Sequence, residues 1–144
     1  NLIDVVATDH APHTLAEKEN PYFTCPSGGP LVQHSLLMMI ELSKKGFFPL
    51  TTVTEKMAHA PARLFGIDRR GFIRKGYFAD LVLVNLNKPH HVTLDTLLYK
   101  CNWSPLEGVH FGSSVTHTFV NGNLVYDGKE VADTYRGMPL QFNR

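Results

Sequence analysis

The sequence has little cysteine, little net charge and no long apolar run. Its two cysteines, Cys25 and Cys101, lie far apart and neither is flanked like a zinc-ligand pair, so we expect reduced thiols in a cytoplasmic protein rather than a disulfide framework. The net charge of +1 comes without clusters of lysine or arginine, which argues against a nucleic-acid or anionic-membrane surface. The longest apolar stretch, Leu36–Ile40, is far too short to cross a bilayer.

The sequence also shows no signal-peptide pattern and no initiator Met, because it opens at Asn1 directly on an apolar, strand-like run. We therefore expect a piece of a longer protein. A hydrophobic fraction of 43% and a charged fraction of 19% are globular values, so disorder is not expected. No internal repeat, phosphate loop or nucleophile elbow is visible.

Two structural parts are predicted, and the first covers residues 1–67. A buried strand over residues 2–8 is followed by a long loop over residues 14–30, which is rich in proline and glycine. A largely buried helix is predicted over residues 31–42, because Pro30 suits a first helical turn. A second helix should follow, with Thr51 or Thr52 as N-cap and Glu55 completing the capping box, and a short helix should begin at Pro61 and end at Gly66.

The second part, residues 68–144, is predicted to be mostly β. A strand is expected over residues 79–86, a brief helix over residues 95–100, and irregular chain from Cys101 to Gly112. Two β-rich runs, residues 117–120 and 123–126, flank an Asn-Gly pair. Both residues of that pair accept the positive φ angles of a type I′ turn, so the sequence predicts a hairpin.

The candidate functional residues gather around the end of the first predicted strand. Asp9 follows the apolar run, and a carboxylate there could bind a metal or move a proton; it could equally cap the next turn. His13 could bind a metal or donate to an anionic group, or it could be an ordinary surface or packed histidine. His10, adjacent to Asp9, is the weaker candidate. No His-x-His pair occurs, so no complete metal site can be written.

The loop before the predicted helix offers a second group of candidates. Ser27, Gly28 and Gly29 could bring backbone N–H and C=O groups close to a ligand, because glycine leaves the backbone unshielded. The alternative is a plain turn. Trp103 and Phe111 are expected to be core or interface aromatics.

Several segments together resemble the cyclic amidohydrolases, and dihydroorotases in particular. The first and the last of these segments are the most specific, and the order along the chain is that of the family. The resemblance covers nearly the whole sequence and rests on Thr8–His13, Ala60–Ile67, Gly71–Val84, and Trp103–Gly108 with Thr118–Gly122.

This resemblance implies an α/β fold: the C-terminal end of a metal-dependent (β/α)8 barrel, followed by part of a β-sandwich subdomain. It implies reversible, zinc-dependent hydrolysis of the cyclic amide of dihydroorotate to N-carbamoyl-L-aspartate, in pyrimidine synthesis. Two zinc ions are expected in the intact enzyme, with most ligands on earlier barrel strands. The partners expected are a small-molecule substrate, the upstream barrel and a second copy in a homodimer, with no nucleic acid or membrane.

The resemblance also assigns roles to individual residues. Asp9 would be a metal ligand and the acid/base, taking a proton from the hydroxide that bridges the zinc ions and passing it to the departing ring nitrogen. His13 would hydrogen-bond the substrate carboxylate. Ser27 and Gly28 would contact the pyrimidine ring through their backbone. This segment alone should be inactive.

Three other interpretations stay open. One is another cyclic amidohydrolase, a hydantoinase, dihydropyrimidinase or allantoinase, in which an uncharged ring would need no donor at His13. A second is a non-catalytic, dihydroorotase-like scaffold. The third is an independent binding module, which we do not expect because the strand over residues 2–7 and the helix over residues 31–42 need partners on several sides.

Overall fold

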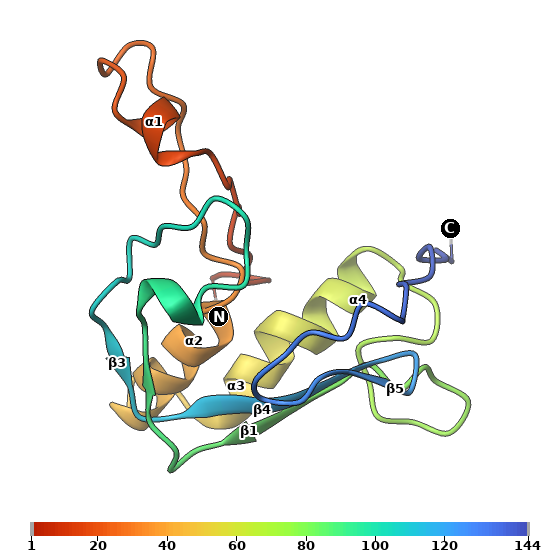
Figure 1. The fold of residues 1–144 in the computed structure, drawn as a ribbon. Helices are drawn as coiled ribbons and strands as arrows, with labels where there is room; N and C mark the ends of the chain where they lie inside the picture. Colours follow the sequence, from red (N-terminus) through yellow and green to blue (C-terminus); the bar gives the residue numbers. More distant parts are fainter. Residues whose placement is uncertain (1, 144) are drawn as a thin grey trace.

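The computed structural model describes residues 2–143, and its first half is mainly helical. Helix α2 (Ser35–Lys44) packs against α3 (Leu50–Thr54), which continues through a π-helical turn, η1 (Glu55–His59), into α4 (Ala60–Leu64). Figure 1 shows α3, η1 and α4 as one nearly continuous helix that runs in roughly the same direction as β1 and β4. A short helix, α1 (Leu15–Lys18), lies in an arm that projects from this body. No helix within residues 2–143 is long and apolar enough to span a bilayer.

The second half forms two antiparallel sheets. The larger has the order β1-β4-β5, from β1 (Leu81–Asn85), β4 (Ser114–Val120) and β5 (Asn123–Tyr126). The smaller pairs β2 (His90–His91) with β3 (His110–Phe111). Of the brief helix expected over residues 95–100, only a 3-10 turn, η2 (Leu94–Thr96), is formed, and residues 97–100 are not helical.

The predicted hairpin is confirmed. Strands β4 and β5 pair in antiparallel register, with Val120 opposite Asn123. Asn121 and Gly122 have φ angles of 52° and 83°, as a type I′ turn requires. The two-residue turn follows the right-handed twist of its strands, which is why so local a signal was sufficient.

A buried arginine ties this hairpin to the end of the helical part. The Arg70 guanidinium lies on the Phe78 ring, 4.2 Å from its centroid, pairs with the Asp80 carboxylate, and donates to Asn121 Oδ1 at 2.8 Å. The Asn121 N–H donates to Asp80 Oδ1 at 2.8 Å. The turn is thus held by side chains from the segment that leaves α4.

The apolar core is small and lies between α2 and the second sheet. Its centre is Leu37, Val92 and Phe111, and part of the chain between η2 and β4 packs on it. Ile40 of α2 and Val53 of α3 are also buried. These contacts fix helix α2, and α2 in turn fixes the loop that precedes it.

The expected first strand is not formed. Residues 2–8 belong to no helix or strand. Their contact with the helices includes one backbone hydrogen bond, from the Val6 N–H to the Lys56 carbonyl at 3.0 Å. Leu2 is 100% and Ile3 66% exposed. A parallel strand needs neighbours on both sides to pair its backbone, and none of the named strands in residues 2–143 lies beside this run.

Helix boundaries differ from the predictions for identifiable reasons. The first long helix begins at Ser35 rather than after Pro30, because residues 31–34 form turns and their polar groups bond other segments. Met38 and Leu42 on this helix are partly exposed. The predicted capping box is wrong: Pro49 is the N-cap of α3 without a side-chain bond, and Glu55 pairs with Arg63 instead.

The sequence predicts that a new helix begins at Pro61, but the helix runs through Pro61 without a break. A proline has no N–H to donate within a helix and crowds the preceding turn. The π-helical turn η1 ends two residues before Pro61, and the wider turn lets the chain pass into α4 without a break. The helix then ends as expected, at Gly66 with φ 62°.

Candidate functional site

Asp9 lies in irregular chain directly before His10. Its backbone has φ 45°. This left-handed conformation is common for glycine, occasional for asparagine and aspartate, and rare for other residues. The Asp9 residue is exposed. The sequence predicts this carboxylate at the mouth of a barrel, but the strands that would surround such a mouth are not among residues 2–143.

The loop after Asp9 is paired with the end of the long loop. His10 forms a parallel bridge with Gly29, and the Ala11 N–H donates to the Gly29 carbonyl at 3.1 Å. His10 Nδ1 accepts from the Val32 N–H at 3.3 Å. The imidazole of His10 therefore serves this pairing.

Gly28 has to be glycine at this contact. Its φ is 87°, and a Cβ atom there would lie 2.6 Å from Ala11 Cβ and 3.9 Å from the Asp9 carbonyl oxygen. The close approach of the two backbones thus depends on the missing side chain. The structure brings Gly28 against the loop of Asp9 and His13, and Ser27 lies exposed next to it.

Between these two segments the chain forms the projecting arm. Thr14 caps α1 and Glu17 completes its capping box. The Lys18 ammonium then donates to the carbonyls of Pro26 and Gly28, at 2.6 and 3.1 Å. One lysine thereby fixes the backbone on both sides of Ser27, and nothing in the sequence pattern marked this residue.

His13 is half-buried at the base of the arm. Its N–H donates to the Ala11 carbonyl at 2.9 Å, which closes a tight turn around Pro12. Its own carbonyl accepts from the indole N–H of Trp103 at 2.7 Å. Trp103, expected only as a core or interface aromatic, is thus a direct contact of the candidate site; its place in the family-like segment Trp103–Gly108 was the available signal.

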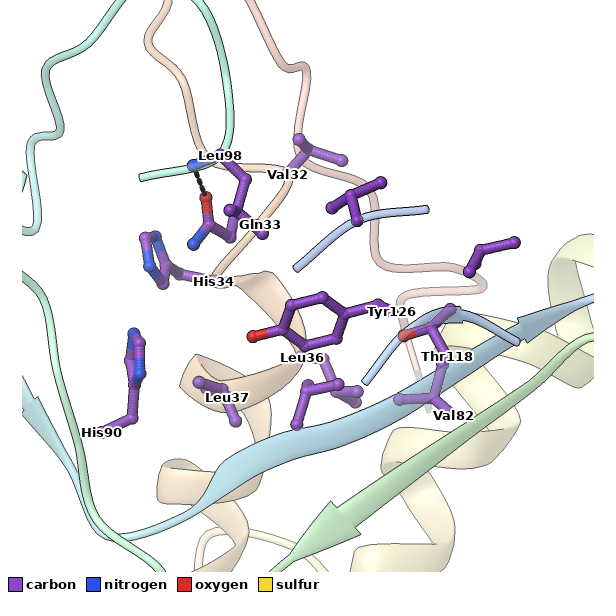
Figure 2. A pocket seen from close by; sticks show the side chains of 13 residues that line it. Val32, Gln33, His34, Leu36, Leu37, Val82, His90, Leu98, Thr118 and Tyr126 are labelled. Carbon is purple, nitrogen blue, oxygen red and sulfur yellow. Dashed lines mark hydrogen bonds between the residues drawn. The ribbon is translucent and has the colours of Figure 1, made fainter. Parts of the chain in front are cut away.

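Two cavities lie between the helices and the sheet, and the smaller one reaches Val32, whose N–H bonds His10. One, of about 410 Å³, is lined by residues of α2, β1, β4 and β5 and by the 32–34 turn (Figure 2). The other, of about 770 Å³, opens between α2, the continuous helix of α3, η1 and α4, and β1. Neither is lined by Asp9, His13, Ser27 or Gly28.

A histidine that the sequence pattern did not single out lines the smaller cavity. His34 is completely buried, and neither of its ring nitrogens has a hydrogen-bond partner. Its ring stacks on Phe111 and lies 5.7 Å from the ring of His90, centroid to centroid. Burial, with a smaller contribution from His90, lowers the pKa of His34 to about 4. His34 is therefore neutral at physiological pH.

The donor set of the described residues fits part of a metal centre and not a whole one. Zinc binding needs three or four converging donors. Within residues 2–143, no three histidine, cysteine, aspartate or glutamate side chains lie together in a way that could hold an ion. The exposed carboxylate of Asp9 can fill one position of a larger site. Cys25 and Cys101 are free thiols.

Comparison with known proteins places the chain in a family. The model of the amidohydrolase family matches residues 1–125. The chain therefore belongs to the amidohydrolase family.

Within that family, the curated relatives include proteins named dihydroorotase. One from Halobacterium salinarum is 42% identical over 90% of this chain and 31% of its own length. Another, from Methanothermobacter thermautotrophicus, is 31% identical over 96% of this chain and 32% of its own length. The chain thus spans about a third of the length of the curated relatives it matches.

Solved structures of related enzymes share the fold. The D-hydantoinase of Bacillus sp. AR9 superposes with a TM-score of 0.81 and 26% identity, over 90% of this chain and 30% of its own. The L-hydantoinase (dihydropyrimidinase) of Arthrobacter aurescens gives a TM-score of 0.82 and 29% identity, over 91% and 30%. These matches confirm the predicted fold class, the C-terminal portion of an amidohydrolase barrel protein.

Proposed function

We propose that this chain is the part of a dihydroorotase that carries one acidic group and the substrate-binding loops of the active site. The intact protein would catalyse reversible opening of the dihydroorotate ring. The observation that supports this best is the packing of the Asp9–His13 loop against Gly28–Gly29, because it gathers the proposed acid, the proposed carboxylate donor and an unshielded backbone in one cluster.

In this proposal each group has one task. Asp9 holds a proton and delivers it to the ring nitrogen that departs when the cyclic amide bond breaks. His13 donates a hydrogen bond to the carboxylate of dihydroorotate, which the uncharged rings of hydantoins lack. The backbone around Ser27 and Gly28 contacts the ring edge. Zinc, when bound, supplies a Lewis acid and activates water at neutral pH.

The first test is the substitution Asp9→Asn in the intact protein. The amide keeps the size of the side chain but cannot accept a proton, so kcat for dihydroorotate should fall about a thousandfold, within the range for loss of a general acid–base group. A steady-state assay of ring opening measures this. The matched control is Asp4→Asn, a carboxylate on the same segment; an equal loss in both variants would contradict the role of Asp9.

The second test is His13→Ala, which distinguishes the two substrate classes. Loss of a donor to the substrate carboxylate should raise KM for dihydroorotate at least tenfold and leave turnover of an uncharged dihydropyrimidine unaffected. His117→Ala, on β4, is the control. Unchanged affinity for dihydroorotate in His13→Ala would reject the assignment, and preferential hydrolysis of hydantoins would favour the rival hydantoinase function.

We also propose that the intact protein is a cytoplasmic homodimer. The free thiols of Cys25 and Cys101 agree with a reducing compartment, and the dimer follows from the resemblance to dihydroorotases. The domain division at residues 67/68 remains a prediction. Sedimentation of the intact protein tests the dimer.

Absence of ring-opening activity in a zinc-loaded intact protein would favour the scaffold interpretation.

A further inference from the structure

Trp103 connects the candidate site to a part of the chain that carries no proposed chemistry. Its indole N–H donates to the His13 carbonyl at 2.7 Å, across 90 positions of sequence. The same side chain lies beside Gly29, where a Cβ atom would be 3.9 Å from Trp103 Cη2. One residue thus contacts both loops of the candidate site.

The carbonyl of His13 is well placed to depend on this donor. The His13 N–H is already used in the turn around Pro12, so Trp103 is the group that fixes the other end of the same residue. Because the N–H and the carbonyl of His13 are both hydrogen-bonded, rotation of the backbone on either side of its Cα, which carries the imidazole, is restricted. A partly buried carbonyl that loses its donor is left without a hydrogen bond, which costs free energy. The contact with Trp103 therefore holds the His13 carbonyl in one orientation.

Trp103 is itself anchored to the core. The next residue, Ser104, is buried, and its hydroxyl accepts from the Leu106 N–H at 3.1 Å. Leu106 packs against the core cluster centred on Leu37, Val92 and Phe111. Pro105, on the other side, lies 3.8 Å from the position of a Gly29 Cβ. Residues 103–106 therefore connect the core cluster to the loop that contains His13.

We propose that Trp103 is a positioning residue for substrate binding: it sets the backbone of His13 so that the imidazole meets the substrate carboxylate. The inference rests on the proposed function of His13. The hydrogen bond of Trp103 goes to the backbone of His13, the proposed substrate-binding residue, so its effect should fall on KM and leave kcat nearly unchanged.

The test uses Trp103→Phe in the intact protein, which keeps an aromatic ring beside Gly29 and removes the N–H donor. KM for dihydroorotate should rise about five- to tenfold, with kcat within about twofold of wild type. Lys44→Met is the matched control, because Lys44 also donates from a side chain to distant backbone carbonyls, those of Leu86 and Gly112, away from the loop. Its KM should not change.

A double-mutant cycle separates positioning from a general loss of stability. If Trp103 acts through His13, Trp103→Phe should have no further effect on KM in a His13→Ala background. Additive effects of the two substitutions, or an unchanged KM in Trp103→Phe alone, would overturn the inference.

Hydrogen exchange distinguishes failure of this inference from failure of the proposed function. The amides of His10, Ala11 and His13 should exchange faster in Trp103→Phe than in Lys44→Met, whatever the substrate is. Unchanged exchange there would reject the role of Trp103. A wild-type protein that does not open dihydroorotate would reject the proposed function, and the exchange result would still decide whether Trp103 holds the loop.

Discussion

At the scale of single residues, the candidate site depends on backbone conformations that most side chains avoid. Asp9 and Gly28 both have positive φ angles, 45° and 87°, and they lie against each other. Left-handed conformations outside glycine persist only where the surrounding contacts enforce them, and they are concentrated in functional loops. Here the enforcing contacts are the pairing with Gly29 and the donations from Lys18.

Gly28→Ala should separate the two loops. The new methyl would meet Ala11 Cβ at 2.6 Å in a strained backbone, whereas Gly108, with φ 82°, has nothing within 4 Å of its Cβ position. Both substitutions carry a similar conformational cost of about 1 kcal/mol, so the difference between them isolates the contact with Ala11. We expect KM of the intact protein to rise at least tenfold in Gly28→Ala only, measured by steady-state kinetics; equal effects would contradict the close approach.

At the scale of elements, the N-terminus of α2 is the point where the core and the loops meet. His34 is the N-cap residue of this helix, and its buried ring faces Phe111 of β3 and His90 of β2. Figure 2 shows both histidines on the same side of the smaller cavity, with the hydroxyl of Tyr126 turned toward them. A positive charge here would be desolvated and would also oppose the helix dipole.

Acid should therefore loosen α2. The pKa of His34 is lowered to about 4 in the folded state from an ordinary value of 6.5, so the unfolded chain binds more protons between these values. Stability is fully present above about pH 6.5 and declines as pH falls toward 4, by up to about 1.4 kcal/mol per pH unit. Burial lowers the pKa of His90 too, which acts in the same direction.

Hydrogen exchange of the α2 amides at pH 7.5 and pH 5, corrected for intrinsic rates, measures this effect. His34→Leu should weaken the pH dependence, while His110→Leu, an exposed position on β3, should not. If wild type and His34→Leu lost protection equally on acidification, another group would be responsible.

At the scale of the whole molecule, the chain leaves much apolar surface uncovered. Tyr22 and Phe23 at the arm are 88% and 97% exposed, and Ile73 is 87% exposed. Leu2 and Ile3 of the unpaired first segment add to this surface. Large apolar side chains that are exposed side by side, as Tyr22 and Phe23 are, mark surfaces that pack against other protein.

The isolated 144-residue chain should therefore self-associate. We expect concentration-dependent oligomers in sedimentation velocity and strong binding of an apolar dye, both reduced when the chain is part of the intact protein. A cooperative melt of a monomer, without dye binding, would contradict this and would favour an independent binding module.

The sequence by itself determined those features that depend on neighbouring residues. The hairpin followed from Asn121 and Gly122, the end of α4 from Gly66, and the family from short motifs whose order is kept. Such features need only local backbone preferences or side-chain identities, which the sequence states directly. Helix α2 was also predicted, but the predicted start at residue 31 is four residues before the observed start at Ser35.

Tertiary structure decided everything that requires a partner distant in sequence. The run over residues 2–8 has the composition of a buried strand, yet it forms none without neighbouring strands to take its backbone hydrogen bonds. The contact of Trp103 with His13 spans 90 positions, and the burial of His34 depends on β2 and β3. A pattern can indicate which residues are suited to chemistry, but only the packing of remote segments fixes which of them meet.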